Sequence, residues 1–326
     1  MAGSIAVADL AERMRPEGVA DPSLAPPDLP SAWRLVRAWT RRHHENFPVL
    51  SSLVPPDLRD DFSAVYAFCR AADDLGDEVG DPARSLEMLA WWRRDLERAF
   101  APEGSPRHPV FVALRDVAAR RQLDARPFHD LISAFELDQV KPRHETFEEV
   151  LAYCRQSADP VGRIVLRLFA ATEDAGSLAA SDAVCTGLQL ANHWQDARRD
   201  LLERDRIYLP REVWPCADFE EKFRRSATQG FAVDAAFLAA SREMIRGLVE
   251  RTSPYFEEGR ALLPRVPAAA RPVIGLFIEG GEEVLRRIAA WDHETILHRP
   301  RIGRLTKAWM VARAWGRARL AWRRPR

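Results

Sequence analysis

The chain has 326 residues, of which 47% are hydrophobic, and its 48 basic residues balance its 48 acidic ones. This length allows one large domain or two small ones with a sizeable core, and the absence of alternating Val, Ile and Thr runs argues against a sheet protein. No window holds the roughly 20 apolar residues of a spanning helix. Met1–Leu10 lacks the basic start of a signal peptide. The four cysteines are scattered, which indicates reduced cytosolic thiols.

The first 30 residues are rich in proline and are predicted to be a disordered leader. A helix is expected from about Ser31, a good N-cap residue, to His44. Phe47-Pro48 would interrupt it, because the residue before a proline is pushed out of the α region.

The next predicted helix, about Asp57 to Glu78, carries acidic residues in a regular spacing. Asp73 and Asp77 are four residues apart, and Arg70 and Tyr66 lie on the preceding turns. Residues at this spacing share one face of a helix. A single Asp-x-x-x-Asp is more often a solvated helix face, so this stretch alone does not establish a site.

The middle of the chain is also predicted to be helical. Thr146 and Glu149 resemble a capping box at the start of a helix that Pro160 ends. The expected helices here cover residues 84–100, 110–122, 127–140 and 161–171.

A second acidic helix is predicted from about Ser181 to Arg204, before Tyr208-Leu209-Pro210. Gln189, Asn192, Asp196 and Asp200 follow a spacing of three, four and four, which places them on one stripe. Oxygen ligands of this kind suit a hard cation such as Mg²⁺. Two carboxylates about 4 Å apart repel by roughly 4 kcal/mol at an effective dielectric near 20, so two facing acidic helices would need cations, and an anion bound to them, to complete the site.

Later helices are predicted at 232–258 and 268–298, and glycines in the second would allow close approach by a helix or a ligand. From Arg299 to the end the chain has ten Lys and Arg and no acid. On a helical wheel, Leu305, Trp309, Trp315 and Leu320 gather on one side, with Arg313 and Arg317 beside them. This pattern fits either a helix that lies on an anionic membrane surface or one that packs on the domain.

Both acidic stretches resemble the two aspartate-rich motifs of the squalene/phytoene synthase family, the head-to-head trans-isoprenyl synthases. The resemblance extends over about residues 32 to 300 and includes His44-Glu-Asn-Phe-Pro48, Tyr153-Cys-Arg-Gln-Ser-Ala-Asp-Pro-Val-Gly162 and Arg206-Ile-Tyr-Leu-Pro210. The Glu-Asn-Phe-Pro and Cys-Arg-x-Ser-Ala-x-Pro-Val-Gly-Arg stretches are most similar to the hydroxysqualene synthases of bacterial hopanoid biosynthesis.

The resemblance implies an all-α, single-domain isoprenoid-synthase bundle around a central cavity at residues 31–300, followed by a basic amphipathic tail at 301–326. It implies several Mg²⁺ ions, a diphosphate leaving group and a carbocation held against aromatic faces. The implied metal ligands are Asp73, Asp77, Asn192, Asp196 and Asp200. The implied catalytic residues are Asp73, Asp77, Asp196, Asp200, Gln156 and Tyr66. The implied substrate-binding residues are His44, Phe47, Arg70, Phe135, Asp138, Gln189, Arg206 and Tyr208.

Gln156 narrows the expected reaction, because reductive squalene synthases carry tyrosine there. We expect presqualene diphosphate to be ionised and the resulting cation to be captured by water, without NADPH. A presqualene diphosphate synthase would be the functional partner that supplies the substrate. The alternative is condensation of two prenyl diphosphates such as farnesyl diphosphate. Nucleic acid is not expected as a partner. A cytoplasmic location is expected, with peripheral attachment to the inner face of the plasma membrane as an alternative.

Two positions depart from the family pattern. Asp159 stands where Asn is expected and could add charge near the site or cap the helix. His193 stands where an aromatic is expected, with a surface or supporting role favoured over direct ligation.

Two other protein classes are alternatives to this family. A di-iron bundle would need Glu-x-x-His pairs, which the sequence lacks. The remaining rival is a membrane-associated helical binding protein without activity.

Overall fold

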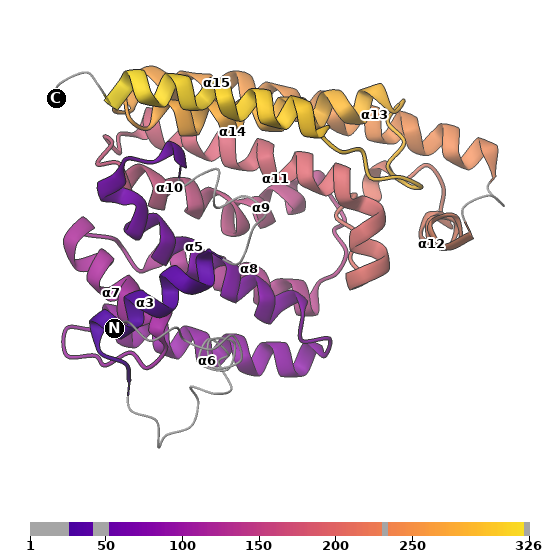
Figure 1. Ribbon diagram of the computed structural model, residues 1–326. Coiled ribbons are helices and arrows are strands. Elements are labelled where there is room, and N and C mark those ends of the chain that lie inside the picture. Colours follow the sequence, from indigo (N-terminus) through magenta and orange to yellow (C-terminus); the bar gives the residue numbers. More distant parts are fainter. Residues whose placement is uncertain (1–25, 42–51, 230–233, 323–326) are drawn as a thin grey trace. The chain divides into compact units, whose positions relative to one another are not determined.

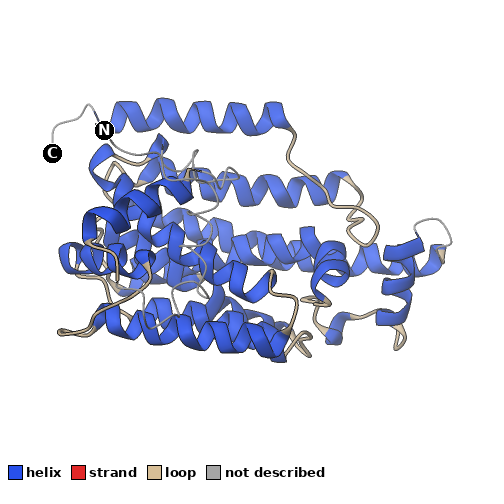
Figure 2. Cartoon of the chain, turned by 60° about the horizontal axis from the view of Figure 1, so that its bottom comes forward, coloured by secondary structure: helices blue, strands red, loops and turns tan. Residues whose placement is uncertain are grey.

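The computed structural model describes residues 26–41, 52–229 and 234–322, and these parts consist of helices joined by loops (Figure 2). The described residues form no β-strand, and their single β-bridge is an isolated parallel one between Arg143 and Ile207. The predicted all-α class is therefore confirmed. The domain boundaries predicted at residues 30 and 300 stay predictions.

The first of two compact units comprises Met1–Gln139 and Ile164–Ala171. In it α5 packs against α3, α6 and α7. Phe68 on the buried face of α5 lies 5.0 Å from Phe128 and 6.0 Å from Trp92, ring centre to ring centre. The helices of this unit are α3 (Leu29–Thr40), η1 (Pro56–Leu58), α5 (Arg59–Asp77), α6 (Pro82–Phe100), α7 (Pro109–Arg121) and α8 (Arg126–Val140).

The second unit comprises Val140–Arg163 and Thr172–Arg326. Here α11 packs against α13 and α14, and α14 packs against α15, so that these long helices form one stack (Figure 1). Its elements are α9 (Phe147–Ser157), α11 (Ala175–Arg204), η2 (Arg211–Val213), α12 (Phe219–Gln229), α13 (Ala235–Gly259), η3 (Arg260–Arg265), α14 (Arg271–Ala290) and α15 (Arg304–Trp322). The short helix α10 (Asp159–Leu168) has residues in both units.

A phenylalanine fixes the spacing of the long helices in the second unit. A Cβ placed on Gly281 of α14 would lie 2.2 Å from the Phe256 ring of α13, and one on Gly187 of α11 would lie 3.1 Å from it. The predicted close approach at the α14 glycines is therefore found at Gly281. Gly275 and Gly280 have open space at the corresponding position.

The cap residues correct several predicted helix ends. Asp28, not Ser31, caps α3, because its carboxylate accepts a hydrogen bond of 2.8 Å from the Ser31 N–H. The capping interaction at Thr146 is confirmed by a bond of 3.2 Å from the Glu149 N–H. The α14 helix ends at Ala290, eight residues before the predicted end, since Asp292 and His293 adopt left-handed φ values of 52° and 59°.

The α12 helix lies outside the helices predicted from the sequence. None of the helices in the described parts of the chain combines the length and the hydropathy needed to cross a bilayer.

Candidate active site

The first acidic stripe lies at the C-terminal end of α5. Arg70 donates to Asp73 at 3.2 Å, and its other terminal nitrogen lies 2.6 Å from Asp74 and 2.9 Å from Glu78. Burial raises the pKa of the Asp74 carboxyl to about 7, although the Arg70 charge acts in the opposite direction. One guanidinium is thus shared by three carboxylates, which leaves this end of α5 rich in negative charge.

An aromatic ring from α8 lies against the same turn of α5. A Cβ on Gly76 would be 3.3 Å from the Phe135 ring, so the absence of a side chain there makes room for the ring. Gln139 on α8 donates to the Gly76 carbonyl at 2.9 Å. Phe135 is therefore held beside the turn that carries Asp73 and Asp77, and Asp138 on the same helix is buried. Tyr66, also on α5, is partly exposed.

The second acidic stripe lies on α11 and is more deeply buried. Asp196 is 6% exposed and Asp200 is 7% exposed. Arg199 lies 3.0 Å from Asp196 and 3.8 Å from Asp200, and Arg204 lies 3.4 Å from Asp200. Burial of two carboxylates is costly unless they are paired, and these arginines supply the pairing.

A segment distant in sequence completes the charge balance at Asp196. Arg299 binds both oxygens of the Asp196 carboxylate, once through Nε and once through a terminal nitrogen at 3.0 Å. The neighbouring residue, Gln195, donates its side-chain amide to the Pro300 carbonyl at 2.6 Å. The two contacts fix the Arg299–Pro300 segment on α11.

The chain leaves α11 by a sharp turn that determines where Arg206 and Tyr208 lie. Asp205 adopts a left-handed φ of 53° and ends the helix. The following residues then run beside the segment before α9, with Ile207 N–H donating to the Pro142 carbonyl and Arg211 N–H donating to the His144 carbonyl, both at 2.9 Å. Both predicted substrate residues, Arg206 and Tyr208, are buried by this arrangement.

Four rings form a buried cluster next to the α11 stripe. Tyr208 stacks on His193 with ring centres 3.9 Å apart, and His144 stacks on Tyr208 at 5.6 Å. Tyr153 lies 5.7 Å from His193 and 5.3 Å from Tyr208. His193 therefore stacks with aromatic rings, at a position where an aromatic residue was expected. The predicted surface role for His193 is wrong, because its side chain is buried and the residue is 4% exposed.

The two imidazoles of this cluster are held in the neutral form. Burial lowers the pKa of His193 to about 3, with a smaller contribution from His144. Burial also lowers the pKa of His144 to about 4. Among the described residues, His193 Nε2 and both ring nitrogens of His144 lack hydrogen-bond partners, so the rings contribute packing more than polar contacts.

The remaining predicted site residues differ in exposure. Asn192 and Gln156 are exposed, whereas Gln189 is partly exposed. Asp159 begins α10, and its buried carboxylate accepts a hydrogen bond of 2.8 Å from Thr186 on α11. Burial raises the pKa of this carboxyl to about 7. His44 and Phe47 lie outside the described residues.

The donor atoms of the two stripes agree in kind with Mg²⁺, which prefers carboxylate and amide oxygen. Asp73 and Asp77 supply two carboxylates on α5, and Asn192, Asp196 and Asp200 supply three oxygen donors on α11. In the described ranges, no three His, Cys, Asp or Glu side chains form a ready ligand cluster. Within α11 the acidic donors are paired with arginine, so a cation would exchange with those contacts.

Sequence reasoning missed several residues that shape the stripes. Arg299 and Arg199 neutralise Asp196, and the spacing of Arg199 from Asp196 on one helix could have indicated its part. Asp74 was passed over because it lies off the Asp73–Asp77 stripe. Gly76 gave no signal beyond the general rule that an isolated helix glycine has a packing reason.

Comparison with known proteins places this chain among isoprenoid synthases. The model of the squalene/phytoene synthase family matches residues 40–306. Hydroxysqualene synthase of Rhodopseudomonas palustris is 36% identical over 236 residues, which cover 71% of this chain and 74% of that protein. The 15-cis-phytoene synthase of Synechococcus elongatus is 34% identical over 62% of this chain and 68% of its own length.

A solved structure agrees with these relatives. The squalene synthase HpnC from Alicyclobacillus acidocaldarius is 40% identical and superposes with a TM-score of 0.70, covering 82% of this chain and 97% of that one. The helices described above therefore have the all-α isoprenoid synthase fold. The chain belongs to the squalene/phytoene synthase family.

Proposed function

We propose that this protein ionises presqualene diphosphate and lets water capture the resulting cation, which yields hydroxysqualene and diphosphate. The observation that carries this choice is the 36% identity to a hydroxysqualene synthase across 71% of the chain. Two further relatives with that name are 39% and 38% identical over 54% and 52% of the chain. Gln156, where reductive relatives have tyrosine, agrees with a reaction that ends on water.

The leaving group requires cations and hydrogen-bond donors. Mg²⁺ held by Asp73, Asp77, Asn192, Asp196 and Asp200 would neutralise the diphosphate as its carbon–oxygen bond breaks. Arg70, Arg206 and Tyr208 would donate to its oxygens, since charged donors bind phosphate strongly. Arg70 already lies among carboxylates and can be shared between them and an anion.

The cation left on the lipid needs aromatic faces and a water molecule. Phe135 is fixed against Gly76 beside the α5 stripe, where its π-face can stabilise positive charge; Tyr66 on the same helix and Phe47 are the other candidates. Gln189 and Asp138 would orient the substrate. Gln156 is exposed, which agrees with a role in positioning water.

The proposed reaction balances without a reductant. The carbon–oxygen bond to diphosphate breaks and the leaving group keeps the electron pair. Water forms the new carbon–oxygen bond and loses one proton. NADPH is therefore not needed, and the substrate must come from an enzyme that joins two farnesyl diphosphates, such as a presqualene diphosphate synthase.

A second candidate is the head-to-head condensation of two prenyl diphosphates. It is favoured by phytoene synthases that match over more of this chain, for example 27% identity over 89% of it. The acidic stripes would serve either reaction. A third possibility, a membrane-associated binding protein without activity, predicts no Mg²⁺-dependent release of diphosphate.

The test is incubation of the purified protein and Mg²⁺ with presqualene diphosphate, farnesyl diphosphate or geranylgeranyl diphosphate, each with and without NADPH. Lipid products are identified by mass spectrometry. Substitution of Gln156 by Ala tests the water step separately, because an unchanged yield of hydroxysqualene would remove Gln156 from it.

A further inference from the structure

The C-terminal helix α15 packs on α14 through a narrow face of small residues. Met310, Ala314 and Ala318, each four residues apart, are 7%, 3% and 0% exposed. Arg313 and Arg317 both bind Glu279 of α14, the second at 2.9 Å. These contacts fix which side of α15 faces the rest of the second unit.

The opposite side of α15 is apolar and uncovered. Leu305, Trp309, Trp315 and Leu320 are 88%, 59%, 40% and 67% exposed. At about 100° per residue these four lie within a sector of about 140°, away from Met310, Ala314 and Ala318. Contiguous apolar surface of this kind usually marks an interaction site.

Cations border this apolar face. The guanidinium of Arg313 lies 4.7 Å from the centre of the Trp309 ring, and that of Arg319 lies 3.7 Å from the Trp315 ring. Arg304, at the start of the helix, is also exposed and lies about 20° beyond Trp315 on the helical wheel. Because no acidic residue occurs from Arg299 to the end of the chain, every charged side chain of α15 itself is basic, and Glu279 of α14 pairs with Arg313 and Arg317 where the two helices meet.

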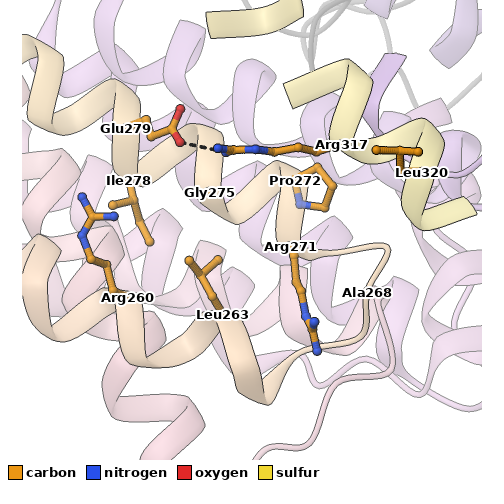
Figure 3. Close-up of a pocket in the computed structure, with 10 residues that line it drawn as sticks. All are labelled: Arg260, Leu263, Ala268, Arg271, Pro272, Gly275, Ile278, Glu279, Arg317 and Leu320. Atoms are coloured by element: carbon orange, nitrogen blue, oxygen red, sulfur yellow. Dashed lines mark hydrogen bonds and ion pairs between the residues drawn. The ribbon is translucent and has the colours of Figure 1, made fainter. Parts of the chain in front are cut away.

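Apolar side chains and arginines also line a pocket next to the C-terminal end of this face. Leu320 also lines a pocket of about 350 Å³ between η3, α14 and α15 (Figure 3). Its walls include Leu263 and Pro272 together with Arg260 and Arg271. Arg271 is exposed and donates to the Val266 carbonyl at 3.3 Å. Glu279 lines the same pocket, where it binds Arg317. Apolar surface with arginines at its edge therefore extends from α15 to α14.

We propose that this face of α15 docks on the surface of an anionic lipid bilayer. Tryptophan and leucine side chains would enter the boundary between headgroups and acyl chains, and the bordering arginines would contact lipid phosphates. The sequence left open whether this helix binds a membrane or packs on the domain. In this proposal it does both, because one face packs on α14 and the other binds lipid. The proposal is independent of the reaction catalysed.

The test measures binding of the full chain to vesicles by co-sedimentation. We expect it to bind vesicles of phosphatidylglycerol and phosphatidylcholine, to bind pure phosphatidylcholine much more weakly, and to dissociate as salt rises. The double substitution Trp309→Ser and Trp315→Ser should lower the partition coefficient at least about tenfold. Trp291→Ser, which removes an indole 51% exposed at the end of α14, is the matched control and should change it less than about twofold.

Charge is tested by Arg304→Gln with Arg319→Gln, which should weaken binding to the anionic vesicles only. Far-ultraviolet circular dichroism and the Tm confirm that each variant folds. Equal affinity for both kinds of vesicle, or no binding to either, would overturn the proposal. So would a dimer in sedimentation velocity that the Trp309 and Trp315 substitutions dissociate, because a second copy of the chain would then cover this face. Vesicle binding is read without substrate, so its result stands apart from that of the product assay.

Discussion

The two acidic helices share the Asp-x-x-x-Asp spacing, but they differ in how many arginines neutralise the carboxylates. On α5, the segment from Arg70 to Glu78 contains four acids and one arginine, and the pKa of Asp74 is raised to about 7. On α11, the segment from Asp196 to Arg206 contains four acids and four arginines. Arg299 adds a further cation at Asp196.

The difference follows from burial. Asp196 and Asp200 are buried and need counterions, whereas Asp73 is partly exposed and water can stabilise its charge. The α5 stripe therefore offers a cation more uncompensated negative charge. The α11 stripe brings arginines with it, and these can turn from carboxylate to diphosphate when an anion and a cation bind together.

Loss of one acid from either stripe should have the largest effect, and this prediction concerns activity. Asp77→Asn on α5 and Asp196→Asn on α11 should each lower kcat about 100-fold or more, since each removes an anionic ligand that supports the leaving group. Diphosphate release at saturating Mg²⁺ measures this. Normal turnover in one variant would show that the corresponding stripe takes no part in the chemistry.

The same two substitutions should differ in stability, and this prediction separates the helices. Asp196→Asn should lower the free energy of unfolding by about 2–3 kcal/mol, because Arg299 and Arg199 lose a buried anionic partner. Asp77→Asn should cost less than about 1 kcal/mol. Urea denaturation of both variants gives the values.

A double-mutant cycle with Arg299→Met provides the control for this stability difference. Asp196→Asn and Arg299→Met should be non-additive, because the two side chains bind each other through two nitrogens. Additive losses would mean that the pair contributes no coupling energy.

The ring cluster beside α11 predicts that stability falls as the pH drops, whereas the raised pKa of Asp74 on α5 acts in the opposite direction. The pKa of His144 is lowered to about 4 in the folded protein, against about 6.5 in the unfolded chain. The unfolded state therefore takes up more protons below pH 6.5, and stability falls as the pH drops. His144→Phe removes this effect, so the wild-type protein should lose about 2 kcal/mol relative to the variant between pH 6.5 and 5.

Urea denaturation at several pH values checks this, and a constant difference between the two proteins would contradict it. His129→Phe is a suitable comparison, because His129 is only partly buried and its Nδ1 accepts a hydrogen bond of 3.1 Å from Arg93.

The smallest effect is expected from the glycine on α5. Gly76→Ala gains about 1 kcal/mol in helix propensity, but its Cβ would crowd the Phe135 ring at 3.3 Å, at a cost of about 2 kcal/mol. A net loss of about 1 kcal/mol should therefore appear in thermal unfolding. Adding Phe135→Leu should recover it; a double variant no more stable than Gly76→Ala alone would mean that the ring is not the obstacle.

Local patterns were sufficient to predict the all-α class and both acidic stripes. The spacing of Asp73 with Asp77, and of Asn192 with Asp196 and Asp200, needed only the helix period. The Thr146 cap was visible for the same reason, since its partner Glu149 is three residues away.

Features that depend on distant residues could not be predicted in this way. Arg299 reaches Asp196 across 103 residues of sequence. The stacking of Tyr208 on His193 requires the turn at Asp205, where no glycine signals the left-handed φ. The end of α14 has a similar cause, because Asp292 and His293 give no glycine or proline signal. The α12 helix was missed because its apolar residues are few, chiefly Phe219, Phe223 and Ala227.

A single product assay decides whether this protein forms hydroxysqualene. Purified protein, Mg²⁺ and presqualene diphosphate are incubated without NADPH, and the lipid fraction is analysed by mass spectrometry. We expect hydroxysqualene with one equivalent of diphosphate, and no product when Mg²⁺ is chelated. Failure to convert presqualene diphosphate, together with formation of phytoene or presqualene diphosphate from simple prenyl diphosphates, would contradict it.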